Sequence, residues 1–415
     1  MSASKRRDPR GVLLPAAVTV GALLIRAWRY SDPPSYVFDE VYYVPDALAY
    51  LDGGVETTWV HPPLGKWLIA AGIRVVGDTP SGWRIASLVF GGLVVLLTYL
   101  LALRLLGSRG WAATASALVA TDGLQIVQSR IATLDIFVAS FIVAGVLLVH
   151  IYARPSSEKP QQPKPLWLAA SGVMFGAALA VKWAALPVLA FAAAAAVAAS
   201  EDRKREALRV MGWLGVVSVA VYVLSYARFW SREALDLGGW FELQRSMLSY
   251  HLGGVGRHSY ASSSVGWLLL RRPVTYFFAA RGNTVQHIVA LGNPLLWWAF
   301  VATLPWLARA WLRKGDHTAD VVLLGFVATY VPWLLVRRTS FLYYLTPLVP
   351  FLAIGVAWAL QRLWRSSFPG ALPRGALVTY LLAAFLTAAL LLPVWIGLPI
   401  EYDHWRRLIL LPGWK

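Results

Sequence analysis

The sequence predicts an all-α membrane protein that crosses the bilayer about eleven times. Composition is the first reason: 58% of the 415 residues are hydrophobic and 14% are charged. A soluble domain carries about a quarter charged residues and fewer apolar ones. The second reason is that the apolar residues form stretches close to the roughly 20 residues that a spanning helix needs.

The predicted spans alternate with short polar connections. A cleaved signal peptide is the alternative for the first stretch, but Arg26, Trp28 and Arg29 follow it without a small-residue cleavage site, which favours an uncleaved span. The expected spans lie near 12–29, 84–106, 111–127, 132–153, 166–182, 184–200, 210–230, 293–312, 319–336, 341–362 and 376–398.

Charge predicts the orientation of these spans. The formal net charge is +17, and many cations lie in short connections such as 104–109, 201–209 and 361–375. Short basic loops face the cytoplasm, so we expect the N-terminus inside and the C-terminus outside the plasma membrane. Removal of the spans leaves no basic soluble domain, which argues against nucleic acid as a partner. The charge instead fits anionic membrane lipid.

Two long loops, 30–83 and 231–292, then fall outside the membrane. We expect them to form the catalytic face of a single transmembrane domain covering residues 1–415. The chain has no cysteine, which excludes disulfides and thiol nucleophiles. Its seven histidines show no convincing metal-ligand spacing, and no Walker or GxSxG motif occurs. No metal site is predicted, and dependence on a divalent metal stays open.

The first long loop carries two candidate motifs. Asp39 and Glu40 form an FDE motif just after the first span. In a partly dry pocket such a carboxylate can serve as a general base, although an isolated acidic pair is more often a solvated turn. Because Pro45 disfavours helix at the residue before it, a helix is expected to start near Pro45.

The second motif is HPPLGK, with His61 and Lys66. Its second proline suits a helix start, and an amphipathic helix is predicted over Pro63 to Val76. A helix-initiation signal explains the prolines but not the histidine and lysine together.

Further cations sit at predicted outer ends of spans, against the positive-inside bias: Arg130, Lys182, Arg337 and Arg338. A bound anion explains all of them, and arginine suits phosphate. An ion pair, for instance with Asp135, explains Arg130 equally well, and snorkelling explains Lys182. Nearby polar candidates for sugar or acceptor contacts are His258, Tyr260, Tyr343 and Tyr344.

Taken in order, these segments resemble the protein O-mannosyltransferases, which are polyprenyl- or dolichyl-phosphate-mannose-dependent enzymes of the GT-C membrane fold. FDE, HPPLGK, SRIATLD from Ser129, VKW from Val181, the HSYAS loop from His258 and the RR…YYL stretch carry the resemblance, together with the Trp-rich C-terminal end. It covers nearly the whole chain. In three respects the chain departs from the family: Trp267 lies further from His258 than usual, Tyr343 and Tyr344 stand where family members often have His-containing variants, and no room remains for the lumenal β-trefoil domain of eukaryotic members.

The resemblance implies inverting transfer of mannose from a polyprenyl-phosphate donor to Ser or Thr hydroxyls of unfolded, translocated proteins, with the Sec translocon as a candidate partner. It implies Asp39 as the base that accepts the acceptor's proton, and Glu40 as a residue that positions the acceptor or orients nearby cations. Arg130, Lys182, Arg337 and Arg338 would hold the donor phosphate, while His61, Lys66, Asp135, His258, Tyr260, Tyr343 and Tyr344 would shape the site.

Two other functions compete with this one. A related GT-C enzyme would use the same type of donor but a lipid or cell-wall glycan as acceptor. A transporter or flippase would need charges buried along several spans and a repeat between halves, and the sequence shows neither.

Overall fold

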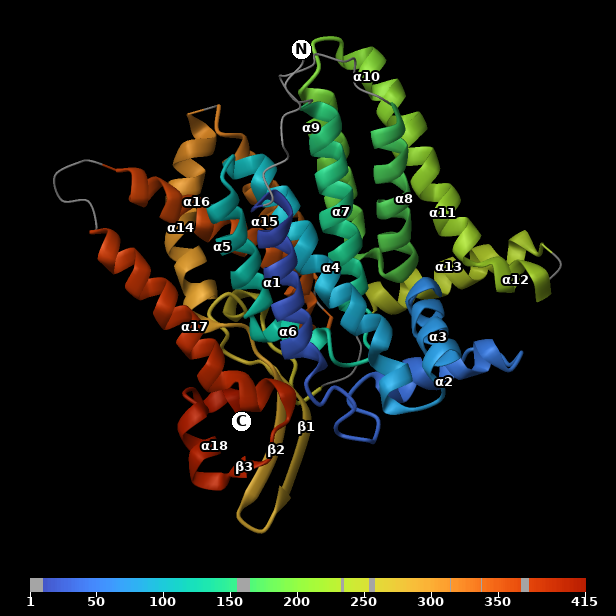
Figure 1. The fold of residues 1–415 in the computed structure, drawn as a ribbon. Coiled ribbons are helices and arrows are strands. Elements are labelled where there is room, and N and C mark those ends of the chain that lie inside the picture. Colours follow the sequence, from blue (N-terminus) through green and yellow to red (C-terminus); the bar gives the residue numbers. More distant parts are fainter. Residues whose placement is uncertain are drawn as a thin grey trace, which may run out of the picture.

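The computed structural model describes residues 10–154, 165–232, 235–253, 258–313, 315–336, 338–366 and 373–415. Apolar helices run side by side through the molecule, and shorter elements gather at one end (Figure 1). The helices of the bundle are α1 (Arg10–Ala27), α4 (Pro80–Leu106), α5 (Arg109–Ala120), α7 (Asp135–Ala153), α8 (Pro165–Val181), α9 (Leu186–Ala198), α10 (Arg203–Arg209), which continues through the π-helix η2 (Val210–Val216) into α11 (Val217–Ser225), α14 (Pro294–Leu312), α15 (His317–Leu335), α16 (Val349–Arg365) and α17 (Arg374–Ile396).

The predicted class, a polytopic helical membrane protein, is confirmed. Within the described residues, 7 helices are long and apolar enough to cross a membrane, and three shorter apolar helices accompany them. Each of the predicted spans contains an apolar helix, but the number that cross the bilayer stays a prediction. Burial identifies the centre of the bundle: the apolar window of Leu342–Arg365 is 94% buried, against 28% for α17.

One predicted span is broken. The stretch 111–127 divides into α5 and the short helix α6 (Gly123–Gln128). Asp122 lies at the break, where its carboxylate accepts the Gln125 N–H at 3.1 Å and the Asn293 N–H at 2.8 Å. Because the carboxylate caps α6 and ties it to the start of α14, the chain turns here instead of continuing as one helix.

The first long loop, 30–83, holds two helices, α2 (Glu40–Leu51) and α3 (Leu64–Val76). The predicted helix at Pro63 to Val76 is confirmed. The expected start of the preceding helix near Pro45 was wrong, because α2 begins at Glu40 and Pro45 lies inside it. The side chain of Glu40 is held by several partners, described below, and these contacts anchor the helix start upstream of the proline.

A small antiparallel sheet was not predicted at all. It consists of β1 (Val274–Arg281), β2 (Thr284–Ala290) and β3 (Ile400–Glu401), in the order β1-β2-β3. Strand β3 joins the sheet just before helix α18 (Tyr402–Leu408), so the C-terminal segment packs on the hairpin at the end where α2 and α3 lie (Figure 1). The remaining short helices are α12 (Ala227–Arg232), α13 (Leu237–Leu252), η1 (Trp183–Ala185), η3 (Ser264–Gly266), η4 (Leu342–Leu348) and η5 (Pro412–Trp414).

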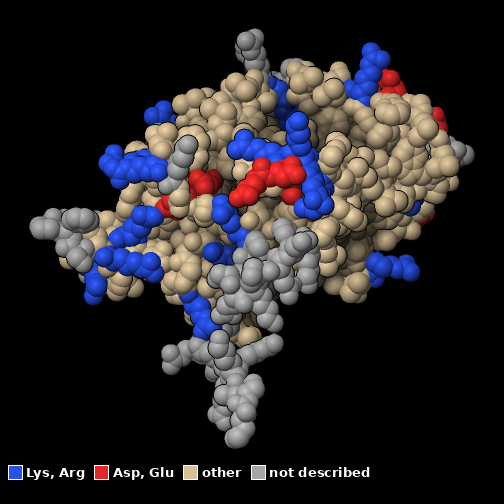
Figure 2. Space-filling model, turned by 90° about the horizontal axis from the view of Figure 1, so that it is seen from above, with Lys and Arg blue, Asp and Glu red and all other residues tan. Residues whose placement is uncertain are grey.

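The opposite end of the bundle is basic. The helix ends that meet there carry the cations Arg104, Arg109, Arg154, Arg309, Arg362 and Arg374. Figure 2 views the molecule from this end, where Lys and Arg lie in several groups and acidic side chains lie among them near the middle of the view. The bundle therefore separates a basic end from the end that carries α2, α3 and the hairpin.

Candidate active site

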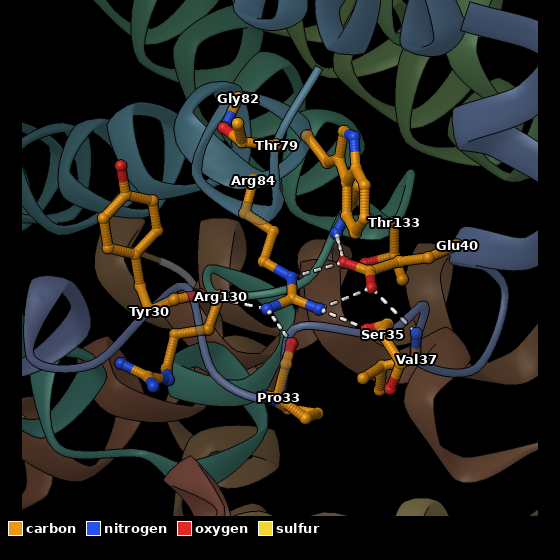
Figure 3. Close-up of polar contacts among 12 residues, drawn as sticks. Tyr30, Pro33, Ser35, Val37, Glu40, Thr79, Gly82, Arg84, Arg130 and Thr133 are labelled. Atoms are coloured by element: carbon orange, nitrogen blue, oxygen red, sulfur yellow. Dashed lines mark hydrogen bonds and ion pairs between the residues drawn. The ribbon is translucent and has the colours of Figure 1, made fainter. Parts of the chain in front are cut away.

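Glu40, in the first long loop, forms a buried ion pair with Arg84 and accepts further hydrogen bonds from the backbone. Its carboxylate accepts from Nε and Nη2 of Arg84 at 2.7 and 2.8 Å, and both residues are fully buried. It also accepts the backbone N–H groups of Val37 and Ala132, each at 2.8 Å. Arg84 donates in addition to the carbonyls of the loop before Glu40, as Figure 3 shows. Glu40 and Arg84 thus fasten the loop and the start of α2 to α4.

Asp39, one residue earlier, lies in a different environment. Its side chain makes no capping hydrogen bond to α2 and is half-buried. Burial raises the pKa of its carboxyl to about 7; the charge of Lys182 lowers this pKa and that of Asp135 raises it further. Phe38 precedes it with a left-handed φ of 53° and stacks on Tyr276 with ring centroids 4.0 Å apart. Such backbone strain persists only where surrounding contacts hold it.

Lys182 and Asp135 form a second buried ion pair. Lys182 Nζ donates to Asp135 Oδ2 at 2.8 Å. The ammonium group also lies 5.8 and 5.7 Å from the ring centroids of Tyr343 and Tyr344. The lysine at the break between α8 and η1 is therefore turned into the protein, and snorkelling does not describe its position.

A cavity of about 310 Å³ lies beside this ion pair. Lys182, Asp135 and Tyr344 line it, together with His61, His251 and Arg338. The predicted residues that the structure brings to this cavity thus come from the first loop, α7, the α8–η1 break and the segment before η4.

Arg338 is held in the cavity by neutral partners. Nη1 donates to Nδ1 of His251 at 2.8 Å, and Nη2 donates to the hydroxyl of Tyr344 at 3.1 Å. Since a guanidinium only donates, Nδ1 of His251 is the acceptor, and its Nε2–H donates to the carbonyl of Val60 at 2.8 Å. Burial, together with the charge of Arg338, lowers the pKa of His251 to about 4, so this ring stays neutral.

His61 stacks on His251 with ring centroids 5.3 Å apart. Burial and the nearby cations hold the pKa of His61 well below its usual range. Its Nδ1 atom is buried and has no hydrogen-bond partner among the described residues. A neutral imidazole therefore faces the cavity with unused hydrogen-bonding capacity.

Lys66 lies apart from this cavity. Its buried ammonium donates to the carbonyl of Thr58 at 2.7 Å, lies 3.5 Å from Asp46 and also pairs with Glu56. The lysine of HPPLGK thus closes the first loop on itself.

Arg130 is also enclosed. Its guanidinium donates to the carbonyls of Trp28 and Arg29 at 2.6 and 2.9 Å, and to that of Arg26, at the C-terminal end of α1. The side chain is 4% exposed. Cations suit a helix C-terminus, and this contact differs from both partners considered for Arg130, a phosphate and a carboxylate.

The remaining predicted residues lie outside the cavity or outside the described chain. His258 is exposed and accepts the Tyr260 N–H at 3.2 Å, while Tyr260 is half-buried. Tyr343 is buried against Phe38 and Tyr276. Arg337 lies outside the described residues. No group of three or more metal-ligating side chains occurs in the described ranges.

Sequence reasoning missed Arg84, Tyr276 and His251. Arg84 stands at the outer end of a predicted span, the same signal that singled out Arg130. His251 and Tyr276 lie in the second long loop without a recognisable motif, and only their contacts reveal them.

Comparison with known proteins supplies the family. The family model for "dolichyl-phosphate-mannose-protein mannosyltransferase" matches residues 16–86 and 76–237. The model for the C-terminal four-transmembrane region of protein-O-mannosyltransferase matches residues 236–414. A polyprenol-phosphate-mannose–protein mannosyltransferase of Corynebacterium glutamicum is 28% identical over 96% of this chain and 93% of its own length. A relative of the same name from Mycobacterium tuberculosis is 28% identical over 98% and 92%.

Solved structures agree on the fold. A chain of the Saccharomyces cerevisiae Pmt1–Pmt2 complex bound to the sugar donor superposes with a TM-score of 0.86 at 16% identity, over 99% of this chain and 93% of that one. ArnT from Cupriavidus metallidurans, bound to undecaprenyl phosphate, gives 0.63 at 17% identity, over 93% and 71%. Fold and site define a membrane glycosyltransferase of the GT-C type. Within that class, the chain belongs to the dolichyl-phosphate-mannose-protein mannosyltransferase family, which confirms the predicted family and enzyme class.

Proposed function

We propose that this protein transfers mannose from polyprenyl-phosphate mannose to Ser or Thr hydroxyls of translocated polypeptides at the outer face of the plasma membrane. One observation carries the proposal. Arg338 and Lys182 line one cavity, and Phe38, the residue before Asp39, packs against Tyr343, whose ring centroid lies 5.8 Å from Lys182 Nζ. Burial raises the pKa of Asp39 to about 7. The reaction needs at least cations that bind the donor phosphate and a general base close to them.

The chemistry follows from the leaving group. The acceptor hydroxyl oxygen attacks C1 of mannose from the face opposite the phosphate, and its proton passes to Asp39. The bond between C1 and the phosphate oxygen breaks, and its electron pair stays on the phosphate. Phosphate leaves without protonation, so the second carboxylic acid that a glycosidase generally uses is unnecessary. One attack from the opposite face inverts the configuration at C1.

Arg338 is the better placed of the two cations to receive the phosphate. Lys182 is already paired with Asp135, whereas the contacts of Arg338 are with a neutral histidine and a tyrosine. Arg338 is half-buried and pairs with no carboxylate among the described residues, so an anionic donor phosphate would supply the counter-charge that partial burial favours. Oriented cations that meet charge developing on the leaving group lower the barrier.

Glu40 serves this site by positioning. Its four contacts with Arg84, Val37 and Ala132 use both carboxylate oxygens. They hold the start of α2, where Asp39 is the N-cap residue. The proposed base is therefore fixed through its neighbour in the chain.

The orientation is part of the proposal. The basic end seen in Figure 2 would face the cytoplasm, which puts the cavity and the C-terminus outside. An unfolded acceptor emerging from the Sec translocon would meet the site there.

A lipid or glycan acceptor is the second candidate, because a GT-C fold, which ArnT shares, does not by itself determine the acceptor. The acceptor is tested by incubating purified protein with radiolabelled polyprenyl-phosphate mannose and either a Ser/Thr peptide or lipid acceptors. Label on the peptide is expected. Label on lipid alone would move the protein to the second candidate, and no transfer from this donor would contradict both.

The base is tested by Asp39→Asn. Loss of the proton acceptor should lower turnover by about a hundredfold or more, while donor binding survives because the cations of the cavity remain. Asp52→Asn is the matched control, since Asp52 is an exposed carboxylate at the other end of α2, and it should keep wild-type turnover. Undiminished transfer by Asp39→Asn would remove Asp39 from the role of base.

A further inference from the structure

A second hollow, of about 130 Å³, lies between α7, α9 and α15. It is far from the proposed active site, because it uses the opposite ends of the same helices. On α7 the catalytic cavity reaches Asp135 and the hollow reaches His150, which at 1.5 Å per residue are roughly 20 Å apart. The hollow therefore lies at the basic end of the bundle.

The walls of the hollow are apolar. On α9 they include Ala192, Ala195 and Ala199, whose spacing puts them on one helix face, and their small side chains leave room. Phe191 of the same helix and Leu324 of α15 complete the apolar lining. Only Val188 and Ala196 of α9 are buried, so this helix is lightly packed beside the hollow.

The rim of the hollow is polar and carries positive charge. Arg154 Nη2 lies 3.4 Å from Nδ1 of His317, which in turn lies 3.3 Å from Asp320 Oδ2. Arg154 forms no ion pair with a carboxylate among the described residues. His150 of α7 lines the hollow as well, and Arg104 of α4 lies at the same end of the bundle. Arg154, His317 and Asp320 thus form a polar rim at the mouth of an apolar hollow, at the basic end of the bundle.

We infer that this hollow binds an anionic phospholipid of the cytoplasmic leaflet, with an acyl chain along α9 and its phosphodiester at Arg154 and His317. An apolar wall below a cationic rim matches an amphiphile with a negatively charged headgroup, and juxtamembrane cations attract the anionic lipids of this leaflet. The bound chain would fill the space beside the small residues of α9 and brace that helix against α15.

The proposed phospholipid and the sugar donor would bind at different sites. The donor phosphate belongs at Arg338, at the other end of α7 and α15. The proposed lipid site can therefore be tested independently of the proposed transferase activity.

The experiment places the full-length protein in nanodiscs of equal parts phosphatidylglycerol and phosphatidylcholine. The protein is then released into detergent, and retained lipids are identified by native mass spectrometry. Wild type should retain phosphatidylglycerol. Arg154→Ala should lower its occupancy about fivefold, the effect of one cation near the membrane surface. Ala195→Phe, which fills the hollow, should lower it at least as much.

Two matched variants guard against general effects. Ala194→Phe adds the same ring at an exposed position outside the lining, and Arg203→Ala removes an exposed cation of α10. Both should retain phosphatidylglycerol, and all four variants should keep peptide mannosylation in detergent. Retention by Ala195→Phe, equal retention of phosphatidylcholine, or a retained polyprenyl phosphate in place of phospholipid would each overturn the inference.

Discussion

The protonation state of Asp39 should govern the pH dependence of transfer. Its pKa lies at about 7 because burial disfavours the charged form. Only the deprotonated carboxylate accepts a proton, so kcat/KM should fall about tenfold per pH unit below that value and level off above it. Initial rates of peptide mannosylation across this range measure the ascending limb.

Lys182 provides the check on this assignment. Its charge lowers the pKa of Asp39, so Lys182→Met should move the ascending limb to higher pH as well as reduce the rate. If the rising part of the pH–rate profile does not shift in this variant, a group other than Asp39 is titrating.

His251 should act on donor affinity through Arg338. It accepts from the guanidinium and donates to Val60 in the first loop. His251→Ala removes the acceptor and should raise KM for the donor about tenfold or more, the cost of a lost hydrogen bond to a charged group, with a smaller change in kcat.

Asparagine is the informative second variant at this position. Its amide oxygen can accept from Arg338, so His251→Asn should recover part of the donor affinity. Equal KM values for the alanine and asparagine variants would indicate that His251 only fills space.

Sequence reasoning reached Asp39 and Glu40 together but could not separate their environments. Adjacent carboxylates look alike in a motif, and their difference depends on Arg84 and on the N–H groups of Val37 and Ala132. The last of these lies far along the chain from Glu40. Similarly, Arg130 and Lys182 were both singled out because they lie at predicted outer ends of spans. In the structure Arg130 donates to backbone carbonyls, whereas Lys182 pairs with Asp135.

At the scale of elements, the lengths of the apolar stretches predicted the bundle helices, because a chain in lipid must satisfy its backbone hydrogen bonds internally and a helix does so. The β-hairpin was missed because burial alternates only from Val274 to Phe277, and the pairing shifts between Thr275 and Phe277 before the turn at Gly282, which has a φ of 56°. Alternation over so few residues is a weak signal inside a long loop. The start of α2 depends on the tertiary contacts of Glu40, and a local rule for proline cannot include them.

The junction of α6 with α17 should be intolerant of added volume. A Cβ on Gly123 would meet the ring of Trp395 and the carbonyl of Leu291. Gly123→Ala should therefore lower stability by about 1–3 kcal/mol, as overpacking does, despite the better helix propensity of alanine. Thermal unfolding in detergent measures the change. Gly110→Ala is the control, because open space surrounds Gly110, and it should be neutral or slightly stabilising. Equal behaviour of the two variants would contradict the tight junction.

At the scale of the whole molecule, cations fall into two groups with different surroundings. Those of the bundle end in Figure 2 lie at the ends of helices and on the connections between them, where positive charge sets orientation. Those at the other end, such as Arg84 and Lys182, are buried and paired. The positive-inside rule predicts the first group from sequence, while the second group breaks that rule and is explained by internal partners.

The orientation of the whole chain can be tested directly because the chain contains no cysteine. Asn283→Cys places a thiol in the exposed turn between β1 and β2, and Lys204→Cys places one on exposed α10 at the basic end. In right-side-out spheroplasts, a membrane-impermeant maleimide should label Asn283→Cys and not Lys204→Cys. Both should label once the membrane is permeabilised, which controls for thiol reactivity. The reverse pattern would put the proposed active site in the cytoplasm, where it could not meet translocated polypeptides.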